Sequence, residues 1–291
     1  MNLATSSATF ADLPLKSIRR SHLEAWVKRM GAAGLAPGTI KTRFNNVRAV
    51  FKAAHRDRLI GTDPPIGVTL SRGRRAESAM TIPTPDQVGK LISAADDWFR
   101  PFVALCAFAG LRLGEAAAPQ LGDVNFLGRQ LTVARQVQRA GGSKVEVRAP
   151  KYASERIVFV ADGLMSLLSA HVASYPVGPE GWLFTGPTGE PPHQNTVGYG
   201  WRKTLRDAGL PGIKLHDLRH FFASGLSAEG CDVVTVQRAL GHSKPTTTLN
   251  TYTHLWPTAE DRTRKAAQRL MDAVAPILLR TLCGLRTSRT L

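Results

Sequence analysis

Apolar residues in the first quarter of the chain recur at the three- and four-residue spacing that puts them on one side of a helix. Ser21 and Glu24 have the S-x-x-E spacing of a capping box, which predicts that a helix starts there. The apolar stripes that follow are Leu23, Trp26, Val27 and Met30, and then Ile40, Phe44, Val47, Phe51 and Ala54. The intervening residues 31–38 contain three glycines, so two helices separated by a turn are predicted.

Basic and polar side chains run beside the second stripe, along one edge of the same predicted helix. They are Lys41, Asn45, Arg48 and Lys52. This edge could lie along a phosphate backbone, although a solvated basic face is the simpler interpretation for a single helix. The segment 62–84 lacks apolar periodicity and carries the cations Arg72, Arg74 and Arg75. A first domain is therefore predicted over residues 1–78, with a basic linker to about residue 84 that could also contact phosphates.

The pattern changes twice in the rest of the chain. Helical spacing begins at Pro85, gives way to apolar alternation between residues 123 and 160, and resumes in four later segments. The later segments are 163–174, 196–208, 216–229 and 233–240. The alternating part, interrupted at Gly128 and at Gly141, predicts a small three-stranded antiparallel sheet. The expected fold class is mainly α with that sheet, in a second domain over residues 85–275 that is followed by a tail at 276–291.

Composition and charge narrow the class of partner. The 291 residues include 38 Lys or Arg and 22 Asp or Glu, a formal net charge of +16. Residues 1–78 carry +9 (14 minus 5) and the longer remainder carries +7 (24 minus 17). Such an excess points to a polyanion, with nucleic acid as the leading candidate. The apolar run at 101–111 is too short to span a bilayer, which takes about 20 residues.

The N-terminus and the cysteines indicate a compartment. The first residues lack a basic stretch followed by an apolar one, so no secretory signal is expected. The three cysteines, an odd number, are Cys106, Cys231 and Cys283. An intracellular, reducing environment, the bacterial cytoplasm, fits these features best.

Four short strings carry residues suited to phosphate chemistry. They are GLRLGE at 110–115, APKYASER at 149–156, HDLRH at 216–220 and LGHSKPTTTLNTYTH at 240–254. Together they supply arginines that can grip nonbridging oxygens, a lysine, histidines and a tyrosine. Cleavage of a phosphodiester without a metal needs such a set, because it requires fixed positive charge, a nucleophile and proton carriers.

Each of these residues also has an ordinary structural explanation. Arg112 could simply pair with Glu115, and two histidines four residues apart on a helix usually satisfy hydrogen bonds in a core. A tyrosine such as Tyr252 more often packs than reacts, and Lys151 in a turn would by default be solvated. Their joint occurrence in a fixed order is what favours a catalytic interpretation.

That order resembles the tyrosine recombinase family, the phage-integrase type of site-specific recombinase. In that family H-x-x-R, L-G-H-S and T-x-x-Y-x-H follow one another near the C-terminal end. Here His216 and Arg219 precede the string LGHS at 240–243, and Tyr252 comes 10 residues after His242. The resemblance covers most of the chain: residues 85–264 resemble the catalytic domain, and residues 11–75 resemble the helical core-binding domain.

The resemblance implies a SAM-like core-binding domain joined to a DNA breaking-rejoining catalytic domain, and a role for each matching residue. Arg112 and Arg219 would hold the scissile phosphate. Tyr252 would attack it and form a 3'-phosphotyrosyl link with release of a 5'-hydroxyl. Lys151 would protonate that leaving oxygen, His216 would accept the tyrosine proton, and His242 would bond a phosphate oxygen. Glu115 is assigned to structure, as a residue that orients the Arg112 turn.

The proton-transfer roles agree with ordinary side-chain acidities. A phenol with a pKa of about 10 is about 0.1% ionised at pH 7, so the nucleophile needs a base or a strong positive field. A histidine near 6.5 suits the base, and a lysine near 10.4 suits the acid. The covalent link conserves the energy of the broken bond, so no cofactor and no metal is expected.

The family also implies partners. Double-stranded DNA is the expected substrate, and exchange between two duplexes requires four active sites, so a homotetramer on DNA is expected. Accessory directionality factors are possible partners, and no membrane is involved. Many phage integrases carry a further N-terminal arm-binding domain, and this sequence is expected to lack it because it begins at or inside the core-binding domain.

Departures from the family pattern leave alternatives open. The turn after Lys151 is short and Phe159 stands where many relatives have proline, so Lys144 is a rival for the general acid. A catalytically impaired or truncated integrase that only binds DNA is the main functional alternative. A type IB topoisomerase shares the chemistry. A metal hydrolase built on His216, His220, His242 and His254 is weaker, since the strings lack the H-E-x-x-H pattern.

Overall fold

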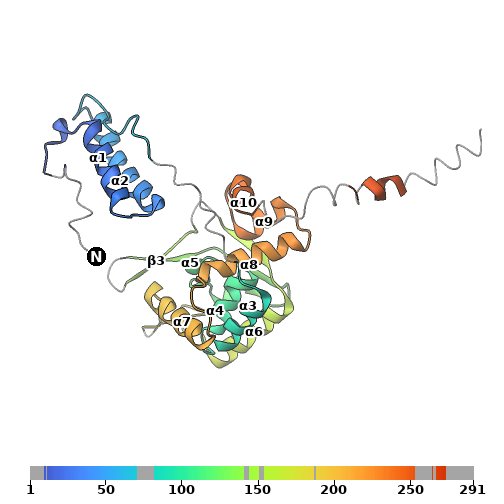
Figure 1. Cartoon of the computed structure of the whole chain (residues 1–291). Coiled ribbons are helices and arrows are strands. Elements are labelled where there is room, and N and C mark those ends of the chain that lie inside the picture. The colour runs from blue at the N-terminus through green and yellow to red at the C-terminus, as the bar shows by residue number, and fades with distance from the viewer. Residues whose placement is uncertain are drawn as a thin grey trace, which may run out of the picture. The chain divides into compact units, whose positions relative to one another are not determined.

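The computed structural model describes residues 10, 12–70, 82–140, 144–150, 154–186, 188–252, 264 and 267–272. The chain divides into two compact units, residues 1–79 and 80–291. Helices dominate both units (Figure 1). None of the helices in the described ranges is long and apolar enough to cross a membrane.

The first unit is built on two helices, α1 (Arg20–Ala32) and α2 (Pro37–Arg56), preceded by the short 3-10 turn η2 (Leu15–Ser17). Both predicted apolar stripes face a common core, whose buried members are Phe10, Ile18, Leu23, Trp26, Met30, Phe44, Phe51, Ala54 and Ile60. Phe10 packs edge-on against Trp26, with ring centroids 5.6 Å apart. The two-helix prediction for this part is confirmed.

The predicted start of the first helix is wrong in its capping residue. Helix α1 begins at Arg20, so Ser21 lies within its first turn. The Arg19 backbone N–H donates instead to His22 Nδ1 at 3.2 Å. Glu24, the expected partner of Ser21, pairs with Arg20 at 2.6 Å. Because Ser21 lies inside the helix, its amide is not an N-cap amide for Glu24 to bond, and the Glu24 carboxylate pairs with Arg20 one turn back.

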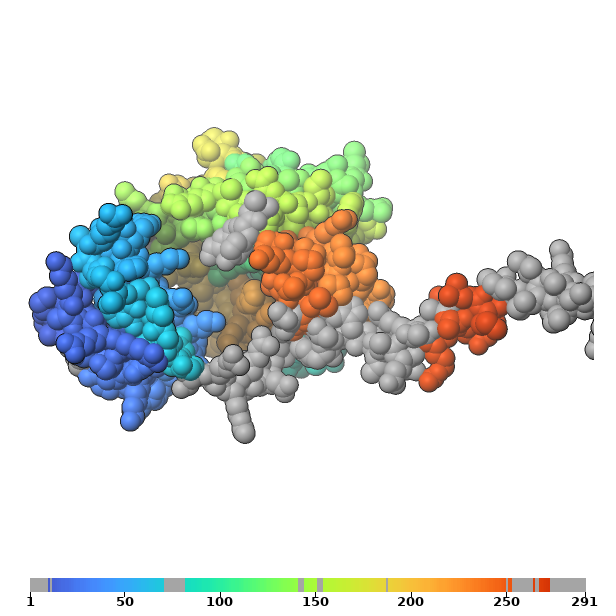
Figure 2. Space-filling model, turned by 90° about the horizontal axis from the view of Figure 1, so that it is seen from above, coloured from blue at the N-terminus to red at the C-terminus, as the bar shows by residue number. Residues whose placement is uncertain are grey.

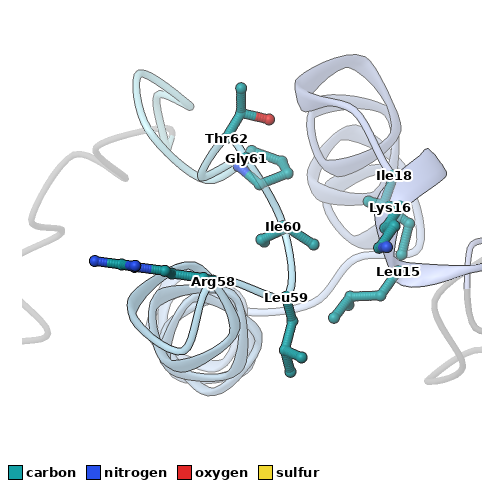
Figure 3. Close-up of a pocket in the computed structure, with 9 residues that line it drawn as sticks. Leu15, Lys16, Ile18, Arg58, Leu59, Ile60, Gly61 and Thr62 are labelled. Atoms are coloured by element: carbon teal, nitrogen blue, oxygen red, sulfur yellow. The ribbon is translucent and has the colours of Figure 1, made fainter.

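Residues 62–70, which follow α2, pack against the core of the first unit, although their composition did not indicate it. Pro64 and Pro65 are buried, and Val68 and Leu70 lie against the core of the unit. Residues 62–70 therefore belong to the first unit, although the segment 62–84 lacks apolar periodicity. Arg72, Arg74 and Arg75 fall outside the described residues. A hollow next to this segment has Lys16 and Arg58 among its lining residues, with Ile60 at its centre (Figure 3).

The second unit contains the remaining helices and all the described strands. Its helices are α3 (Pro85–Ala94), α4 (Arg100–Phe108), α5 (Leu113–Ala116), the 3-10 turn η3 (Leu121–Asp123), α6 (Asp162–Ser174), α7 (Gln194–Asp207), α8 (Leu215–Ala228), α9 (Val233–Leu240) and α10 (Pro245–Tyr252). Its strands are β1 (Val124–Asn125), β2 (Gln130–Val133), β3 (Gln136–Arg139), β4 (Val145–Arg148) and β5 (Arg156–Phe159). Helix α10 was not predicted, because its threonine-rich sequence is a poor helix former.

The described strands form two antiparallel sheets. A three-stranded antiparallel sheet is present in the order β1-β2-β5, with Leu131 opposite Val158, but its strands are not all the predicted ones. Residues 136–139 and 145–148 do not join it; they form a separate two-stranded ladder, β3-β4, in which Val137 lies opposite Val147. The chain leaves the first sheet at Arg135, whose guanidinium pairs with Asp123. This ion pair lies at the break between β2 and β3.

Helix α4 is the centre of the second unit. Its residues from Pro101 to Ala107 are all buried, which is why this part of the sequence is almost purely apolar. Helices α3, α6 and α8 pack around it. Helix α3 starts at a reciprocal cap, in which the Gln87 N–H donates to Thr84 Oγ1 and the Thr84 N–H donates to Gln87 Oε1. Because α8 packs on α4, the residues of HDLRH (216–220) lie next to those of GLRLGE (110–115).

Candidate active site

The turn between α4 and α5 presents Arg112 and depends on a glycine. Gly110 has φ +63°, in the left-handed region that glycine tolerates best. A Cβ at this position would lie 2.5 Å from Phe222 Cδ1, so side chains are excluded on two grounds. The carbonyl of Gly110 accepts a hydrogen bond from Arg219 Nη1. The turn therefore holds the two arginines of the predicted site next to each other.

Glu115 is the buried acid around which the arginines gather. It is 2% exposed, and its carboxylate accepts from Arg112 Nη1 at 2.5 Å and from Arg156 Nη2 at 2.9 Å. Arg219 Nη1 lies 3.9 Å away. Burial opposes its ionisation, but the charges and hydrogen bonds of Arg156 and Arg112 outweigh that effect and lower the pKa of Glu115 to about 2. Glu115 is thus ionised at neutral pH and fixes the arginines.

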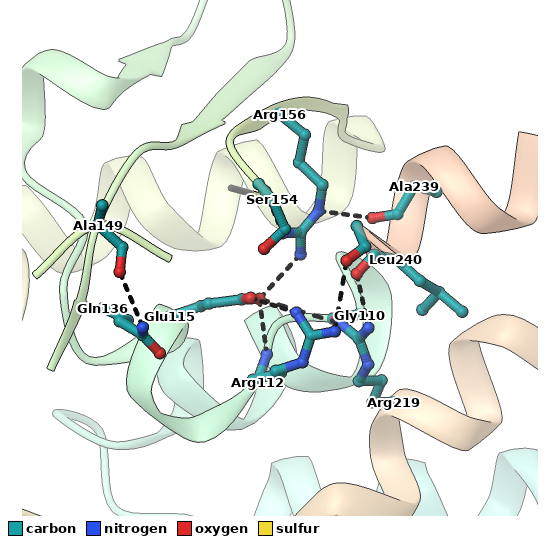
Figure 4. Close-up of polar contacts among 11 residues, drawn as sticks. Gly110, Arg112, Glu115, Gln136, Ala149, Ser154, Arg156, Arg219, Ala239 and Leu240 are labelled. Carbon is teal, nitrogen blue, oxygen red and sulfur yellow. Dashed lines mark hydrogen bonds and ion pairs between the residues drawn. The ribbon is translucent and has the colours of Figure 1, made fainter. Parts of the chain in front are cut away.

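The same three arginines bond successive backbone carbonyls at the C-terminal end of α9 (Figure 4). The pairs are Arg156 Nε to Ala239 O at 2.8 Å, Arg219 Nη2 to Leu240 O at 2.6 Å and Arg112 Nη2 to Gly241 O at 3.4 Å. The last carbonyls of a helix lack partners within it and carry the negative end of the helix dipole. The end of α9 therefore attracts the guanidinium groups and aligns them.

Arg219 is held more tightly than an arginine on a surface. It is 1% exposed, and burial together with Arg112 lowers its pKa to about 9, so it stays charged at neutral pH. Its position in α8 puts it one turn from His216 and beside His220, on the helix face that packs on α4. A fixed, partly desolvated charge of this kind interacts strongly with a phosphate that approaches it.

Tyr252 ends α10 and lies in a small cluster formed by α8 and α9. The side chain is 1% exposed and packs with Ala223, Val236 and Leu240. Its hydroxyl lies 2.7 Å from His220 Nδ1. Burial raises the pKa of Tyr252 to about 12, although Arg219 and Arg112 act in the opposite direction. In this conformation the phenol is neutral and inside the protein.

The histidines of the site are neutral as well. Burial is the main cause that lowers the pKa of His216 to about 4 and that of His242 to about 4, with Arg219 and Arg112 adding to it. The His216 ring packs edge-on against His220, with centroids 4.8 Å apart. His242 Nδ1 lies 2.8 Å from the hydroxyl oxygen of Thr248, one turn before Tyr252 on α10. Both rings are therefore neutral at physiological pH, and each keeps one unprotonated nitrogen that can act as an acceptor.

The structure brings most of the predicted site residues together. Arg112, His216, Arg219, His242 and Tyr252 come from the α4–α5 turn, α8, the α9–α10 turn and α10, and share contacts or charge interactions. Figure 2 shows the surface of α9 and α10, in orange, beside the yellow-green strand residues, in agreement with the packing of α9 on β5.

Other predicted residues lie elsewhere. Lys151 falls outside the described residues. Its rival Lys144 is exposed immediately before β4. On α2 of the first unit, the side chains of Lys41, Asn45, Arg48 and Lys52 are all exposed, along the edge that the sequence predicted.

Arg156 is a member of the site that the sequence did not predict. It is on β5 and links Glu115 to the end of α9 through the contacts given above, with a further bond from Nη1 to Ser154 O at 3.3 Å. Its position inside the string APKYASER was visible, but nothing in the string distinguished a buried arginine from an exposed one. In the described part of the chain, no group of three or more His, Cys, Asp or Glu side chains could hold a metal ion.

Comparison with known proteins identifies the family. The model of the phage integrase family matches residues 83–258, more than half of the chain. The chain is 28% identical over 272 residues to a putative prophage phiRv2 integrase of Mycobacterium tuberculosis, covering 90% of this chain and 69% of that one. It is 24% identical over 271 residues to a XerC-like tyrosine recombinase of Caldanaerobacter subterraneus, covering 84% and 69%.

Solved structures share the fold. The Tn1549 transposon integrase in complex with a circular intermediate DNA superposes with a TM-score of 0.76 at 21% identity, over 91% of this chain and 90% of that one. A lambda integrase dimer bound to a COC' core site gives 0.59 at 18% identity, over 81% and 83%. With relatives named as integrases and recombinases, the binding-only alternative is not favoured. The chain therefore belongs to the phage integrase family of tyrosine recombinases, and its activity is site-specific recombination.

Proposed function

We propose that this recombinase cleaves and rejoins duplex DNA through a covalent bond between Tyr252 and a 3'-phosphate, for integration or excision of a mobile element. The observation that carries the proposal is the convergence of two fixed guanidinium groups, two neutral imidazoles and one phenol in a single site of the second unit. This set matches the needs of metal-free phosphodiester transfer.

Arg112 and Arg219 bind the scissile phosphate in this mechanism. Glu115 and the carbonyls at the end of α9 use some of their donors, and each guanidinium has five N–H groups, so donors remain for phosphate oxygens. The carboxylate and carbonyls hold the two groups in place before the substrate arrives. Positive charge that needs no reorganisation favours the additional negative charge of the transition state.

The reaction is an in-line displacement at phosphorus. The Tyr252 oxygen bonds to phosphorus while the bond from phosphorus to the 5'-oxygen breaks, and the product is a 3'-phosphotyrosyl link with a 5'-hydroxyl. His216, neutral at physiological pH, accepts the phenolic proton, and Lys151 protonates the leaving 5'-oxygen. His242 bonds a nonbridging oxygen. Rejoining reverses these steps with a new 5'-hydroxyl.

The phenol must change its surroundings for this reaction. With a pKa of about 12, only about one Tyr252 in 100,000 is ionised at pH 7. A phosphate bound by the remaining donors of Arg112 and Arg219 brings the electrophilic phosphorus to the Tyr252 oxygen, and the phenol loses its proton as the new bond forms. DNA binding and ionisation of Tyr252 are therefore coupled in the proposed cycle.

The proposed partners follow from the same chemistry. Duplex DNA contacts the exposed cationic edge of α2 as well as the catalytic site, and DNA complexes of the Tn1549 and lambda integrases support this assignment. Exchange of two duplexes uses four active sites, so a homotetramer assembles on DNA. The protein is DNA-associated in the cytoplasm, and accessory factors bias the direction of exchange.

The test is covalent capture on nicked duplexes made from the DNA that flanks the gene, in the presence of EDTA. The wild-type protein forms an adduct that survives denaturation, and Tyr252→Phe forms none. Tyr199→Phe is the matched control, because Tyr199 is exposed on α7, and it forms the adduct at the wild-type rate. An adduct with Tyr252→Phe would show that another residue is the nucleophile.

The general acid is tested with a substrate that carries sulfur in place of the 5'-bridging oxygen. Thiolate leaves without protonation, so the substitution restores cleavage to a protein that lacks its acid. Lys151→Ala is expected to be inactive on the oxygen substrate and active on the sulfur substrate. The same pattern in Lys144→Ala, with Lys151→Ala unaffected on both substrates, would assign the acid to Lys144.

A further inference from the structure

His216 and His220 lie one turn apart on α8 near Tyr252, and it is His220 that contacts the Tyr252 hydroxyl. His216 and His220 are both on α8, at the spacing that puts them on one face. The H-x-x-R pattern assigns the proton acceptor to His216. Yet the hydrogen bond at Tyr252 Oη, 2.7 Å long, runs to His220 Nδ1, and His216 contacts the His220 ring instead.

The direction of this bond follows from the surroundings of the pair. The phenol is protonated, because burial raises its pKa, so the hydroxyl donates. Burial lowers the pKa of His220, and among the charged neighbours Asp217 opposes this effect while Arg219 adds to it. His220 is therefore neutral, with its proton on Nε2 and its lone pair on Nδ1 facing the hydroxyl.

The bond is one of two that hold α10 through successive turns. Thr248 and Tyr252 are four residues apart and face the same side of the helix. Thr248, fully buried, is bonded by His242 from the preceding turn, and Tyr252 is bonded by His220 from α8. Two imidazoles from separate elements thus fix both the position of α10 and the rotamer of its last side chain.

We propose that His220 is the positioning residue of the nucleophile: its Nδ1 holds the Tyr252 hydroxyl at a fixed place beside Arg219 and the H-x-x-R histidine. This inference rests on the proposed role of Tyr252. His220 acts through geometry: it fixes the phenolic oxygen, and in the proposed reaction the hydroxyl proton turns from Nδ1 of His220 to His216 as the phosphate is attacked. Because the hydrogen bond restricts the Tyr252 side chain to few rotamers, a larger fraction of bound phosphates meets the hydroxyl in a geometry that can react.

The amide side chains distinguish positioning from proton transfer. Asparagine places its oxygen close to the position of Nδ1 and can accept the tyrosine hydrogen bond, but it cannot take up a proton. Glutamine places its oxygen near the position of Nε2, and leucine has no acceptor. We therefore expect His220→Asn to cleave the nicked duplex within about threefold of wild type, and His220→Leu and His220→Gln to be slower by about 10- to 100-fold.

The control substitution is His193→Leu, which removes an Nδ1 acceptor at the N-cap of α7 in the same unit and leaves this site intact. It cleaves like wild type. Loss of activity in His220→Asn equal to that in His220→Leu would mean that His220 takes the proton, and wild-type cleavage by His220→Leu would mean that the bond has no role. Either result overturns the proposal. If the leucine variant does not fold, the comparison of Asn with Gln gives the same decision.

A second readout needs no DNA and separates this inference from the proposed function. The ionisation of Tyr252 is followed by NMR of protein labelled with 13C at the tyrosine ring carbon that bears oxygen, with Tyr252→Phe to identify the signal. Because His220 bonds the neutral phenol, its loss in His220→Leu lowers the pKa of Tyr252, and His220→Asn restores it. A pKa equal in all three proteins would overturn the inference even if the covalent adduct forms. If the pKa of Tyr252 differs between these proteins as expected but no covalent adduct forms, the contact with His220 stands and the assignment of Tyr252 as the nucleophile is wrong.

Discussion

Replacement of Glu115 by glutamine tests whether the buried carboxylate is what assembles the arginines. The substitution keeps the volume and one acceptor oxygen but removes the charge that Arg112 and Arg156 share. The pKa of Glu115 falls from 4.5 to about 2 in the folded protein. By linkage, that difference corresponds to about 3 kcal/mol of folding free energy at pH 7. Breaking a buried ion pair typically costs a similar amount.

The pH dependence has a definite sign. A carboxylate whose pKa is depressed by folding contributes its full stabilisation above the pKa of the unfolded chain, and loses it as the pH falls toward the pKa of the folded state. The difference in unfolding free energy between wild type and Glu115→Gln is therefore about 3 kcal/mol at pH 7. It falls to about 2 kcal/mol at pH 3.5.

The assay is urea unfolding followed by tryptophan fluorescence, which reports on the second unit through Trp98, Trp182 and Trp201. Glu146→Gln is the control, because Glu146 forms an exposed pair with Arg148 and its loss should cost less than about 0.5 kcal/mol. A cost for Glu115→Gln below about 1 kcal/mol, or a cost equal at pH 7 and pH 3.5, would refute the argument that this charge organises the site.

Three further predictions address the turn, the first unit and the DNA footprint. Gly110→Ala introduces a strained φ and a clash with Phe222. It should therefore lower the unfolding free energy of the second unit by about 1–3 kcal/mol. A variant as stable as wild type would contradict the role given to the Gly110 turn. Leu23→Ala, at a fully buried site, should destabilise the first unit by about 2–5 kcal/mol in the same assay while the transition of the second unit stays in place. Joint replacement of Lys41, Arg48 and Lys52 by glutamine should weaken DNA binding and reduce the slope of log affinity against log salt by up to about 3, as measured by fluorescence anisotropy. An unchanged slope would show that these side chains of α2 do not contact DNA phosphates.

Local patterns in the sequence were sufficient for most elements and for the residues that the motifs contain. The helical spacing from Pro85 onward predicted helices in the region of α3 and α4, and the stripes beginning at Leu23 and Ile40 predicted α1 and α2. The spacing of His216, His220 and Arg219 placed them on one helix. Such predictions succeed because burial repeats with the period of the helix, which is a property of neighbours in sequence.

Competing local partners account for the errors. Glu24 pairs with Arg20 and does not form the predicted cap. The strands divide into two sheets at Arg135, which pairs with Asp123. Pro64 is buried in the first unit, although the composition around it did not indicate packing. In each case the partner found in the structure was an ion pair or a buried surface, which the capping and propensity patterns of the sequence do not include.

The sequence by itself determined most of the helices, though not α10, together with the apolar faces of α1 and α2 and, through the family motifs, the identity of the reactive side chains. The tertiary structure alone decided their partners: Arg112 reaches a carbonyl 129 residues away, Arg219 one 109 residues away, and Arg156 joins Glu115 from another element. It also decided that the Tyr252 hydroxyl meets His220. Hydrogen bonds between distant segments depend on how α4, α8 and α9 pack, and packing depends on the whole core at once, so no local pattern carries that information.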